Sequence, residues 1–414
     1  MIRSTLVLLH RYLGLATAIF LALAGLTGAI LAFHHEIDEW LNPEFYTVSE
    51  KAADAGGPLG LVALAARAQA DHPQLEIIYI ESEGEADHPV LAVGEPRPDP
   101  AGGPMPEVDY NFIYLDPISG ETLATRYWAR CCFSAEDFIP FIYEFHHTLT
   151  LPGIWGYLLM GAVAIFWTVD CLIALVLTFP RGQWFLSGPF FAKWKTAWQV
   201  KRNGGSYRTN LDLHRAGGLW LWLILLPVAV SSIAMNLPDQ VFRPVVSLFS
   251  PVEQSVYYQR GSWTAEEIGE KGQNYADIVS KGEVAARQHG LDMPIYGLYY
   301  DTLHNYYAVG YGSHDGELLG SPWFYFDGGD GRLLRADIPG RGTAGEIFEQ
   351  LQLPIHGGRI GGLAGRIVIC VTGLVICMLS VTGVVIWWKK RGARRVRAER
   401  STGAAVPAEN FAGE

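Results

Sequence analysis

Charged side chains are scarce in this chain: Asp, Glu, Lys and Arg make up 18% of its 414 residues, whereas hydrophobic residues make up 50%. Such a composition excludes an intrinsically disordered chain and is unusual for a soluble protein of this length. The mean hydropathy of +0.15 is consistent with this. We therefore expect a membrane protein.

Cysteine is also rare, and none of the five cysteines lies in a C-x-x-C-H motif. A covalently attached, c-type haem is therefore excluded. Cys171, Cys370 and Cys377 fall within apolar runs and are predicted to be packing residues. Cys131 and Cys132 are neighbours in a long segment between apolar runs, where they could form a vicinal disulfide, stay as thiols or contact a partner.

Long runs without charge, in contrast, are abundant. About 20 apolar residues span the ~30 Å hydrocarbon core of a bilayer, and four stretches reach that length, the second broken only by Asp170. The first follows Arg3 and Arg11, but it is too long for a signal peptide and lacks a cleavage site, so we expect an uncleaved span. The predicted spans are residues 13–33, 149–178, 216–237 and 367–388.

The formal net charge of −11 conceals two regions of opposite sign. Residues 1–12, 180–215 and 389–414 hold 16 Lys and Arg against four acids, a net charge of +12, whereas the charges in and beside the two long segments give −22, and Asp170 accounts for the remaining −1. Because cytoplasmic loops are enriched in Lys and Arg, both termini are predicted to be cytoplasmic. The net charge of −11 argues against nucleic-acid binding. The acidic exterior could steer cationic substrates or ferric complexes toward the protein, but we interpret it as ordinary soluble surface.

The two long outer segments share one pattern: a helix, three short strands and a glycine-containing turn. In the first, the helix is 57–70, the strands are 75–80, 90–93 and 110–115, and the turn is 116–120. In the second, the helix is 275–289, the strands are 295–300, 306–311 and 323–326, and the turn is 327–331. Two similar α+β modules are therefore predicted. The segment 94–107 is predicted to be a loop and the tail beyond residue 400 to be disordered.

The apolar segments repeat as well. The pattern H-R-x-x-G-L occurs at residues 10–15 and at 214–219, and the second and fourth spans each start from a histidine that is followed by several glycines. We therefore predict an internal duplication that builds a four-helix transmembrane bundle with two outer α+β modules. The predicted parts are 1–33 (span), 34–146 (outer module), 147–179 (span), 180–213 (cytoplasmic loop), 214–237 (span), 238–355 (outer module), 356–388 (span) and 389–414 (cytoplasmic tail).

Seven of the twelve histidines lie at span ends, although histidine is costly in hydrocarbon unless it is paired or bound to a metal. Antiparallel spans would place His10 beside His214 at the inner face and His146 beside His356 at the outer face. Two imidazoles on facing helices can supply both axial ligands of a haem. Residues 10 and 34 would lie about 36 Å apart along a helix, so two haems are predicted. The alternative ligands at the outer face are His147, His34 and His35.

Other interpretations of the histidines remain open. Histidines at headgroup depth can simply be hydrated, although pairs on both faces are less expected on that basis. Zinc is the rival metal: the sequence has no H-E-x-x-H motif, but the five outer histidines could converge on one ion. The nearby glycines suit either a flat macrocycle lying on a helix or tight helix packing.

Charged residues beside the histidines also have two candidate roles. Arginines next to them could pair with haem propionates or anchor the spans at the interface. Asp170 is a candidate proton or quinol contact, or else a hydrogen-bonded acid with Ser231 or Ser232 as its partner. The candidate arginines are Arg11 and Arg215 inside, and Arg359 and Arg366 outside.

Several of these segments resemble the PepSY-associated transmembrane proteins, which are bacterial inner-membrane proteins with four spans and periplasmic PepSY modules. The similarity covers nearly the whole chain apart from the tail. The outer modules match mainly by pattern and by LDPISGETL at 115–123. The other matching segments are LHRYLGLATAIFLALAGLTGAILAF (9–33), FHHTLTLPGIWG (145–156), NLDLHRAGGLWLWLILLPVAVSSIAMNLP (210–238), LPIHGGRIGGLAGR (353–366) and TGVVIWWKKR (382–391).

The resemblance implies a ferric-siderophore reductase that carries two haems b and releases Fe(II) in the periplasm. By position it assigns His10 and His214 to the inner haem, and His146 and His356 to the outer haem. The family motif has an aromatic residue where this chain has His147, so the sequence departs from the family there.

The implied partners are a ferric siderophore, the lipid bilayer and an electron donor. The loop 180–215 is too short for a flavin or nicotinamide domain, so a separate reductase or a quinol would supply electrons. A homodimer is one conceivable assembly. The alternative function is a non-redox, membrane-anchored regulator or sensor, because PepSY domains elsewhere are linked to protease inhibition.

Overall fold

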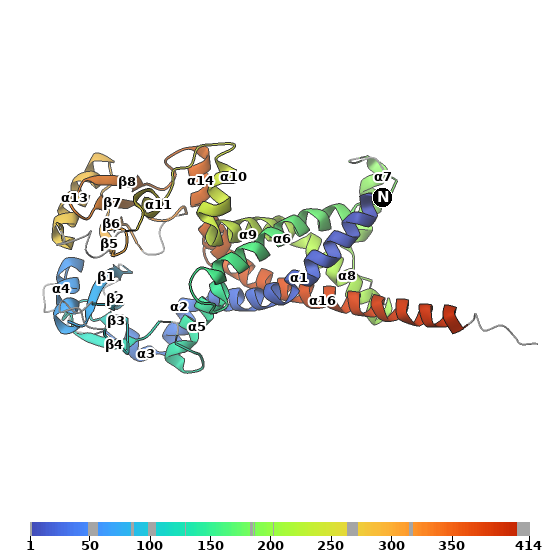
Figure 1. The fold of residues 1–414 in the computed structure, drawn as a ribbon, viewed down its shortest axis with the longest axis horizontal. Helices are drawn as coiled ribbons and strands as arrows, with labels where there is room; N and C mark the ends of the chain where they lie inside the picture. Colours follow the sequence, from blue (N-terminus) through green and yellow to red (C-terminus); the bar gives the residue numbers. More distant parts are fainter. Residues whose placement is uncertain are drawn as a thin grey trace, which may run out of the picture.

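The computed structural model describes most of the chain (Figure 1). The described residues are 2–48, 57–83, 87–97, 105–128, 130–182, 185, 187–201, 203–262, 272–313 and 318–403. Part of the predicted loop, 98–104, and the end of the predicted tail, 404–414, lie outside them.

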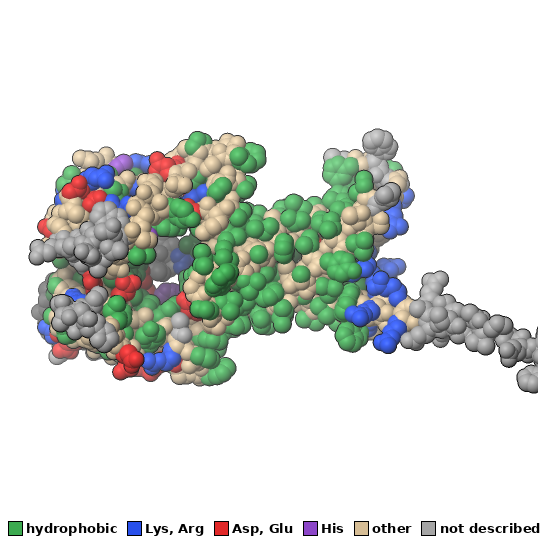
Figure 2. Space-filling model, in the orientation of Figure 1, with side chains coloured by type: hydrophobic (Ala, Val, Ile, Leu, Met, Phe, Trp, Pro, Cys, Tyr) green, Lys and Arg blue, Asp and Glu red, His purple; other side chains and the backbone are tan. Residues whose placement is uncertain are grey.

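Apolar helices form one end of the elongated molecule and a β-sheet forms the other (Figure 1). Three helices are long and apolar enough to cross a membrane: α1 (Ile2–Leu31), α6 (Trp155–Thr178) and the segment Arg359–Arg395, most of which belongs to α16 (Gly362–Gly403). A bent helix pair would make a fourth span. Hydrophobic side chains cover the surface of this region (Figure 2). The chain is therefore a membrane protein with several spans.

The predicted third span is bent in the structure. Helix α8 (Gly205–Trp220) and helix α9 (Trp222–Asn236) meet at Leu221 with a bend of 72°. Pro227 lies inside α9, where it has no N–H to bond the carbonyl of the preceding turn. Helix α1 packs against α6 and α16, α6 packs against α9, and α8 packs against α16. The fourth predicted span also differs, because α16 continues past residue 388 to Gly403.

The strands of both outer segments form one antiparallel sheet of eight strands in the order β4-β3-β2-β1-β5-β6-β7-β8. The two halves meet where β1 pairs with β5, through Tyr79–Tyr299, Ile80–Leu298 and Glu81–Gly297. We call this pairing the seam. The strands are β1 (Leu75–Ser82), β2 (Val90–Pro96), β3 (Phe112–Leu115), β4 (Thr122–Arg126), β5 (Ile295–Asp301), β6 (Tyr306–Tyr311), β7 (Trp323–Asp327) and β8 (Leu333–Asp337).

A single hydrophobic core underlies this sheet. Helices α4 (Leu61–Asp71) and α13 (Tyr275–Gln288) cover the face turned away from the apolar helices (Figure 1). Side chains from both halves belong to one buried cluster, for example Leu64 and Ile80 from the first half and Leu298 and Phe324 from the second. The two predicted modules are therefore joined by strand pairing and by a common core.

Most of the predicted elements of the sheet are present, but β4 and β8 were not predicted. Both are edge strands of five residues, and most of their side chains remain partly exposed, so their alternation of apolar and polar residues is weak. The turns that precede them share one hydrogen-bond pattern. Asp116 Oδ1 accepts from the backbone of Ile118 and Ser119, and Asp327 Oδ1 accepts from that of Gly329 and Asp330.

Short helices connect the sheet to the apolar helices and line the opposite end. Those on the sheet side are α2 (His34–Leu41), α3 (Pro43–Tyr46), α5 (Ala135–Thr148), η3 (Pro238–Phe242), α10 (Arg243–Val246), α11 (Val256–Arg260), α14 (Ala344–Gln350), α15 (Gln352–Gly357) and η4 (Arg359–Gly361). At the opposite end lie α7 (Gly188–Trp194) and η2 (Lys195–Trp198).

Candidate functional site

One pair of histidines lies at the end of the apolar helices away from the sheet. His10 of α1 and His214 of α8 have ring centres 6.1 Å apart. Packing of α8 against α16 places the His214 ring beside Gly383, where a Cβ atom would lie 3.2 Å from the imidazole Cε1. Glycine at this position therefore leaves room for the ring. We call His10 and His214 the inner pair.

A second pair lies at the end of the apolar helices nearer the sheet. His146 of α5 and His356 of α15 have ring centres 6.2 Å apart. The His146 ring packs on α1 at Gly28, where a Cβ atom would come within 3.0 Å of it. Helix α15 ends just after His356, because Gly358 adopts a φ of +75° that glycine tolerates without strain. We call His146 and His356 the outer pair.

The Nδ1 atom of each paired histidine is held by a polar side chain. Residues that fix one ring nitrogen in this way orient the imidazole and leave Nε2 to bind a metal. Asp170 and Thr382 therefore act at the inner pair, and Thr27 and Ser231 at the outer pair. The four distances are 2.9 Å for His10–Asp170, 3.0 Å for His214–Thr382, 2.8 Å for His146–Thr27 and 2.9 Å for His356–Ser231.

The hydroxyl partners are compatible with a proton on Nδ1. Each hydroxyl lies within hydrogen-bond distance of a carbonyl of its own helix, and a hydroxyl that donates its single hydrogen there accepts from an N–H at Nδ1 of the histidine. The lone pair of a neutral imidazole is then on Nε2, as metal binding requires. The hydroxyl-to-carbonyl bonds are Thr27 to Leu23 (2.9 Å), Ser231 to Val228 (2.9 Å) and Thr382 to Met378 (2.7 Å).

The separation within each pair fits two imidazoles that share one metal ion. With metal–nitrogen bonds of about 2 Å, imidazoles on opposite sides of one ion have ring centres roughly 6 Å apart. The observed separations are 6.1 Å and 6.2 Å. Within the part of the chain that the structure describes, no three His, Cys, Asp or Glu side chains group to hold a metal ion. Two protein ligands per ion suit a haem, whose porphyrin supplies the other donors, better than they suit zinc.

Each pair combines one histidine from each half of the chain. His10 and His146 precede the loop between α6 and α7, whereas His214 and His356 follow it. Thr27, the partner of His146, lies 17 residues after His10 on α1, which is about 25 Å along a helix. The two pairs are therefore separate sites at opposite ends of the apolar helices.

The other outer histidines have different neighbours. The ring of His147 packs on Tyr143, with 4.4 Å between ring centres, and lies 5.7 Å from that of His146. His34 contacts the Leu31 carbonyl, and His35 lies 3.5 Å from a carboxylate oxygen of Glu83. The structure thus brings His146, rather than one of these alternatives, against His356.

Two of the four predicted propionate contacts are already engaged. Arg215 donates to the buried Asp212 and to backbone carbonyls of the segment before α8. Arg366 donates to Glu36 and to the carbonyl of Ala32. These bonds favour a structural role for both arginines. Arg11 and Arg359 remain candidates for the propionate role.

The predicted partners of Asp170 are wrong, and the partners of the histidines were missed. Asp170 contacts His10, while Ser231 contacts His356 and Ser232 bonds the Val228 carbonyl of its own helix. Two of the missed partners occupy equivalent positions in the sequence repeat. Thr27 follows His10 by 17 residues, and Ser231 follows His214 by the same number. Alignment of the two H-R-x-x-G-L patterns would have matched these hydroxyls.

The glycines of the spans serve mainly close packing. At Gly25 a Cβ atom would lie 2.5 Å from the Gly373 carbonyl oxygen of α16, and at Gly161 it would lie 2.4 Å from Leu237. These positions therefore allow neighbouring helices to approach closely. Gly28 and Gly383 instead make room for imidazole rings.

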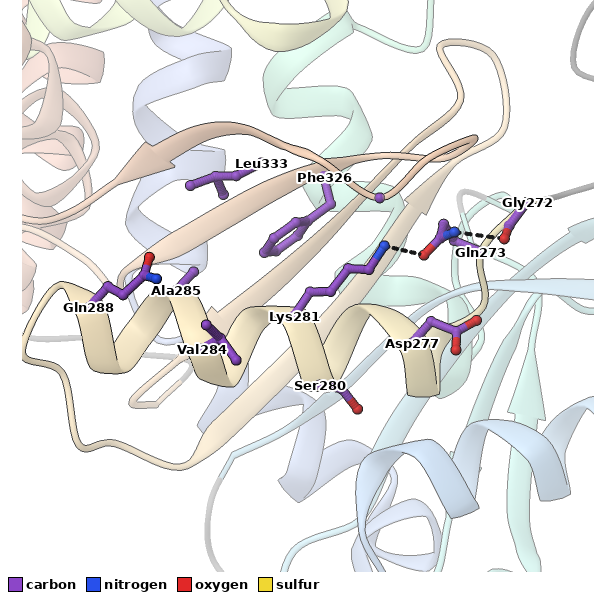
Figure 3. Close-up of a pocket in the computed structure, with 11 residues that line it drawn as sticks. Gly272, Gln273, Asp277, Ser280, Lys281, Val284, Ala285, Gln288, Phe326 and Leu333 are labelled. Atoms are coloured by element: carbon purple, nitrogen blue, oxygen red, sulfur yellow. Dashed lines mark hydrogen bonds between the residues drawn. The ribbon is translucent and has the colours of Figure 1, made fainter.

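A pocket of about 750 Å³ lies elsewhere, along α13 and the β7–β8 edge of the sheet (Figure 3). Its one lysine, Lys281, donates to the Gln273 side chain and to the Asp330 carbonyl. Most of its lining residues belong to α13, which covers the sheet face turned away from the apolar helices (Figure 1). It contributes nothing to the candidate site.

Comparison with known proteins identifies the family of this chain. Residues 7–390 match the family model described as PepSY-associated TM region. No curated protein matches the chain.

Proposed function

Because this chain belongs to the family of the PepSY-associated TM region, we propose that it binds two haems b and carries electrons out across the bacterial inner membrane. The acceptor we propose is a ferric siderophore, which releases iron as Fe(II) after reduction. The observation that carries the proposal is the presence of two histidine pairs, with ring centres 6.1 Å and 6.2 Å apart, at opposite ends of the apolar helices.

In this proposal the chain supplies ligands, orientation and an apolar surrounding. His10 and His214 hold the inner haem, and His146 and His356 hold the outer one. When bound, haem supplies one-electron redox chemistry that none of these side chains can provide. A ferric siderophore gains one electron, and its hard oxygen ligands bind the resulting Fe(II) less tightly than Fe(III). The donor is a separate reductase or a quinol.

The proposed orientation places the sheet in the periplasm and both termini in the cytoplasm. Lys and Arg gather at the end of the apolar helices opposite the sheet, and acidic residues lie on the sheet (Figure 2). This distribution supports the orientation, since cytoplasmic loops are enriched in Lys and Arg. We also propose that the bent pair α8–α9 completes a four-helix bundle and that the two halves arose by duplication. The mirrored strand order on the two sides of the seam supports the duplication.

The absorption spectrum of the purified full-length protein tests the proposal. After expression with sufficient haem, we expect a Soret band and a bound haem content of two per chain. A protein without a Soret band would instead favour the non-redox regulator or sensor.

Ligand variants test the residue assignments. His214→Ala and His356→Ala should each remove about half of the haem, because each breaks one pair. His88→Ala is the matched control, since His88 lies in the sheet region beside Asp87. Full haem retention in both ligand variants would refute the assignments.

The substrate is tested separately. The dithionite-reduced protein should be reoxidised by a ferric siderophore, as followed by its visible bands. Absence of reoxidation would leave a haem protein with another electron acceptor.

A further inference from the structure

The two histidine pairs differ in the charge of the groups that hold Nδ1. At the outer pair both partners are neutral hydroxyls, those of Thr27 and Ser231. At the inner pair, Thr382 is a hydroxyl but Asp170 is a carboxyl group. The inner pair therefore has an acidic partner that the outer pair lacks.

The structure points Asp170 specifically at His10. Its Oδ1 lies 2.9 Å from Nδ1 of His10, and the Asp170 side chain is only 13% exposed within the apolar helices. The other carboxylate oxygen of Asp170 faces Gly14, one turn after His10, where a Cβ atom would lie at ordinary contact distance, 3.7 Å from Oδ2. Within the described parts of the chain, no Lys or Arg side chain forms an ion pair with Asp170.

A carboxylate bonded to a ligating imidazole changes the electronic properties of the metal. It makes the imidazole a stronger donor, because the N–H at Nδ1 is drawn toward the negative charge. A stronger donor and a nearby negative charge both favour the more positive oxidation state, and the low dielectric of an apolar interior strengthens that effect. A hydroxyl orients the ring without adding charge.

From this difference we infer that Asp170 sets the direction of electron flow by giving the inner site a lower reduction potential than the outer site. The inference rests on the proposed function, since it concerns haems held by these histidines. One electron then passes outward with falling free energy: the inner iron is oxidised to Fe(III), the outer iron is reduced to Fe(II), and no bond forms or breaks. Asp170 acts in this as a positioning and tuning residue.

The test is a spectroelectrochemical titration of the full-length haem-loaded protein, with Asp170→Asn as the variant. Asparagine keeps the size and an acceptor oxygen but removes the charge. The wild-type titration should resolve two one-electron components, and in Asp170→Asn only the lower one should move, toward more positive potential. We expect at least a tenfold change in its reduction equilibrium, which is about 59 mV for one electron.

Single-haem backgrounds assign the components to sites. In His356→Ala, which keeps the inner pair, Asp170→Asn should shift the remaining component. In His214→Ala, which keeps the outer pair, the same substitution should leave the potential unchanged. An unmoved inner component, or an equal shift in both backgrounds, would overturn the inference while haem binding itself remained intact.

A reciprocal variant keeps the inference testable if Asp170→Asn cannot be purified. Thr27→Asp gives the outer pair a carboxyl partner and should lower the reduction potential of the outer site. Thr27→Val, in contrast, should change the reduction equilibrium of the outer site by less than tenfold. An outer component that is the same in both variants would contradict the tuning role. A wild-type protein that binds no haem would refute the proposed function, and this inference with it.

Discussion

At the scale of single residues, a buried ion pair joins α2, the short helix that follows α1, to the sheet. Arg126 of β4 makes two bonds to Asp38 of α2, at 2.9 Å and 2.8 Å, and both side chains are only 5% exposed. Tyr46 and Asn42 also donate to Asp38. Removing one partner of a buried pair leaves an uncompensated charge.

We therefore predict that Arg126→Met lowers the free energy of unfolding of the sheet region by about 3–5 kcal/mol. Denaturant unfolding of the full-length protein, followed by the β-sheet signal in circular dichroism, measures the loss. The control is Arg67→Met, because its partner Asp71 is exposed and such pairs contribute about 0–1 kcal/mol. Equal losses in the two variants would contradict the prediction.

A buried histidine in the sheet region makes its stability depend on pH. His72 is held between Tyr110 and Thr122, at 2.6 Å and 2.9 Å, and burial lowers its pKa below the usual 6.5. The folded state then binds this proton less readily than the unfolded state. The contribution of His72 is therefore fully present above pH 6.5 and is lost as the pH falls toward the lowered pKa.

We accordingly predict that the midpoint of thermal unfolding falls between pH 7 and pH 5, and that it falls less steeply in His72→Gln. Melting curves at several pH values compare the two proteins, so contributions from other histidines cancel in the difference. If the unfolding midpoint changed equally with pH in the two proteins, His72 would not be responsible for the pH dependence.

At the scale of secondary-structure elements, α1 and α16 cross in close backbone contact. The backbones meet at Gly25 and Gly373. A Cβ atom added to Gly25 would lie 2.5 Å from the Gly373 carbonyl oxygen, and one added to Gly373 would lie 2.4 Å from the Gly25 carbonyl oxygen. Any side chain here must push the helices apart. Since α1 carries His10 and α16 carries Thr382, separation would also disturb the inner pair.

Gly25→Leu is therefore expected to destabilise the helical region by about 1–3 kcal/mol, the usual cost of overpacking. It should also reduce bound haem, which is measured together with the unfolding temperature. The matched control is Gly392→Ala in α16, where nothing lies within 4 Å of the added atom. A Gly25→Leu protein as stable as this control would be inconsistent with the crossing.

Much of the element order could be predicted from the sequence. Charge-free length predicted α1 and α6, and strand-like runs predicted β1, β2, β3, β5, β6 and β7. The bend between α8 and α9 could not be predicted by hydropathy, because a broken apolar run has the same composition as a straight one. The pairing of β1 with β5 also lies beyond sequence patterns, since it depends on a contact between residues more than 200 positions apart.

At the scale of the whole molecule, both histidine pairs depend on the two halves of the chain coming together. We predict that the halves, cut between α6 and α7 and expressed together, associate and bind haem, whereas neither half alone does. Copurification through a tag on one half, with the absorption spectrum of the product, measures both outcomes. Haem bound stoichiometrically by one half alone would show that the pairs are not the sites.

The pairing of the candidate ligands was accessible from the sequence because it follows from topology. Lys and Arg distribution predicted which span ends share a face, and this placed His10 with His214 and His146 with His356. The groups that hold Nδ1 were accessible only in part. The repeat relates Thr27 to Ser231, but which side chains face the imidazoles depends on the rotation of each helix about its axis, and an apolar span without a clear polar stripe leaves that rotation undetermined.

The seam between β1 and β5 has a mechanical consequence. Many membrane proteins built from two repeats transport solutes by rocking one half against the other, which opens the site to each side in turn. Here such rocking would have to tear or bend a continuous sheet that joins both halves outside the apolar helices. The sheet therefore holds the two halves together and opposes rotation of one against the other. Such a connection suits the electron transfer proposed above, because an electron crosses without any opening between the halves.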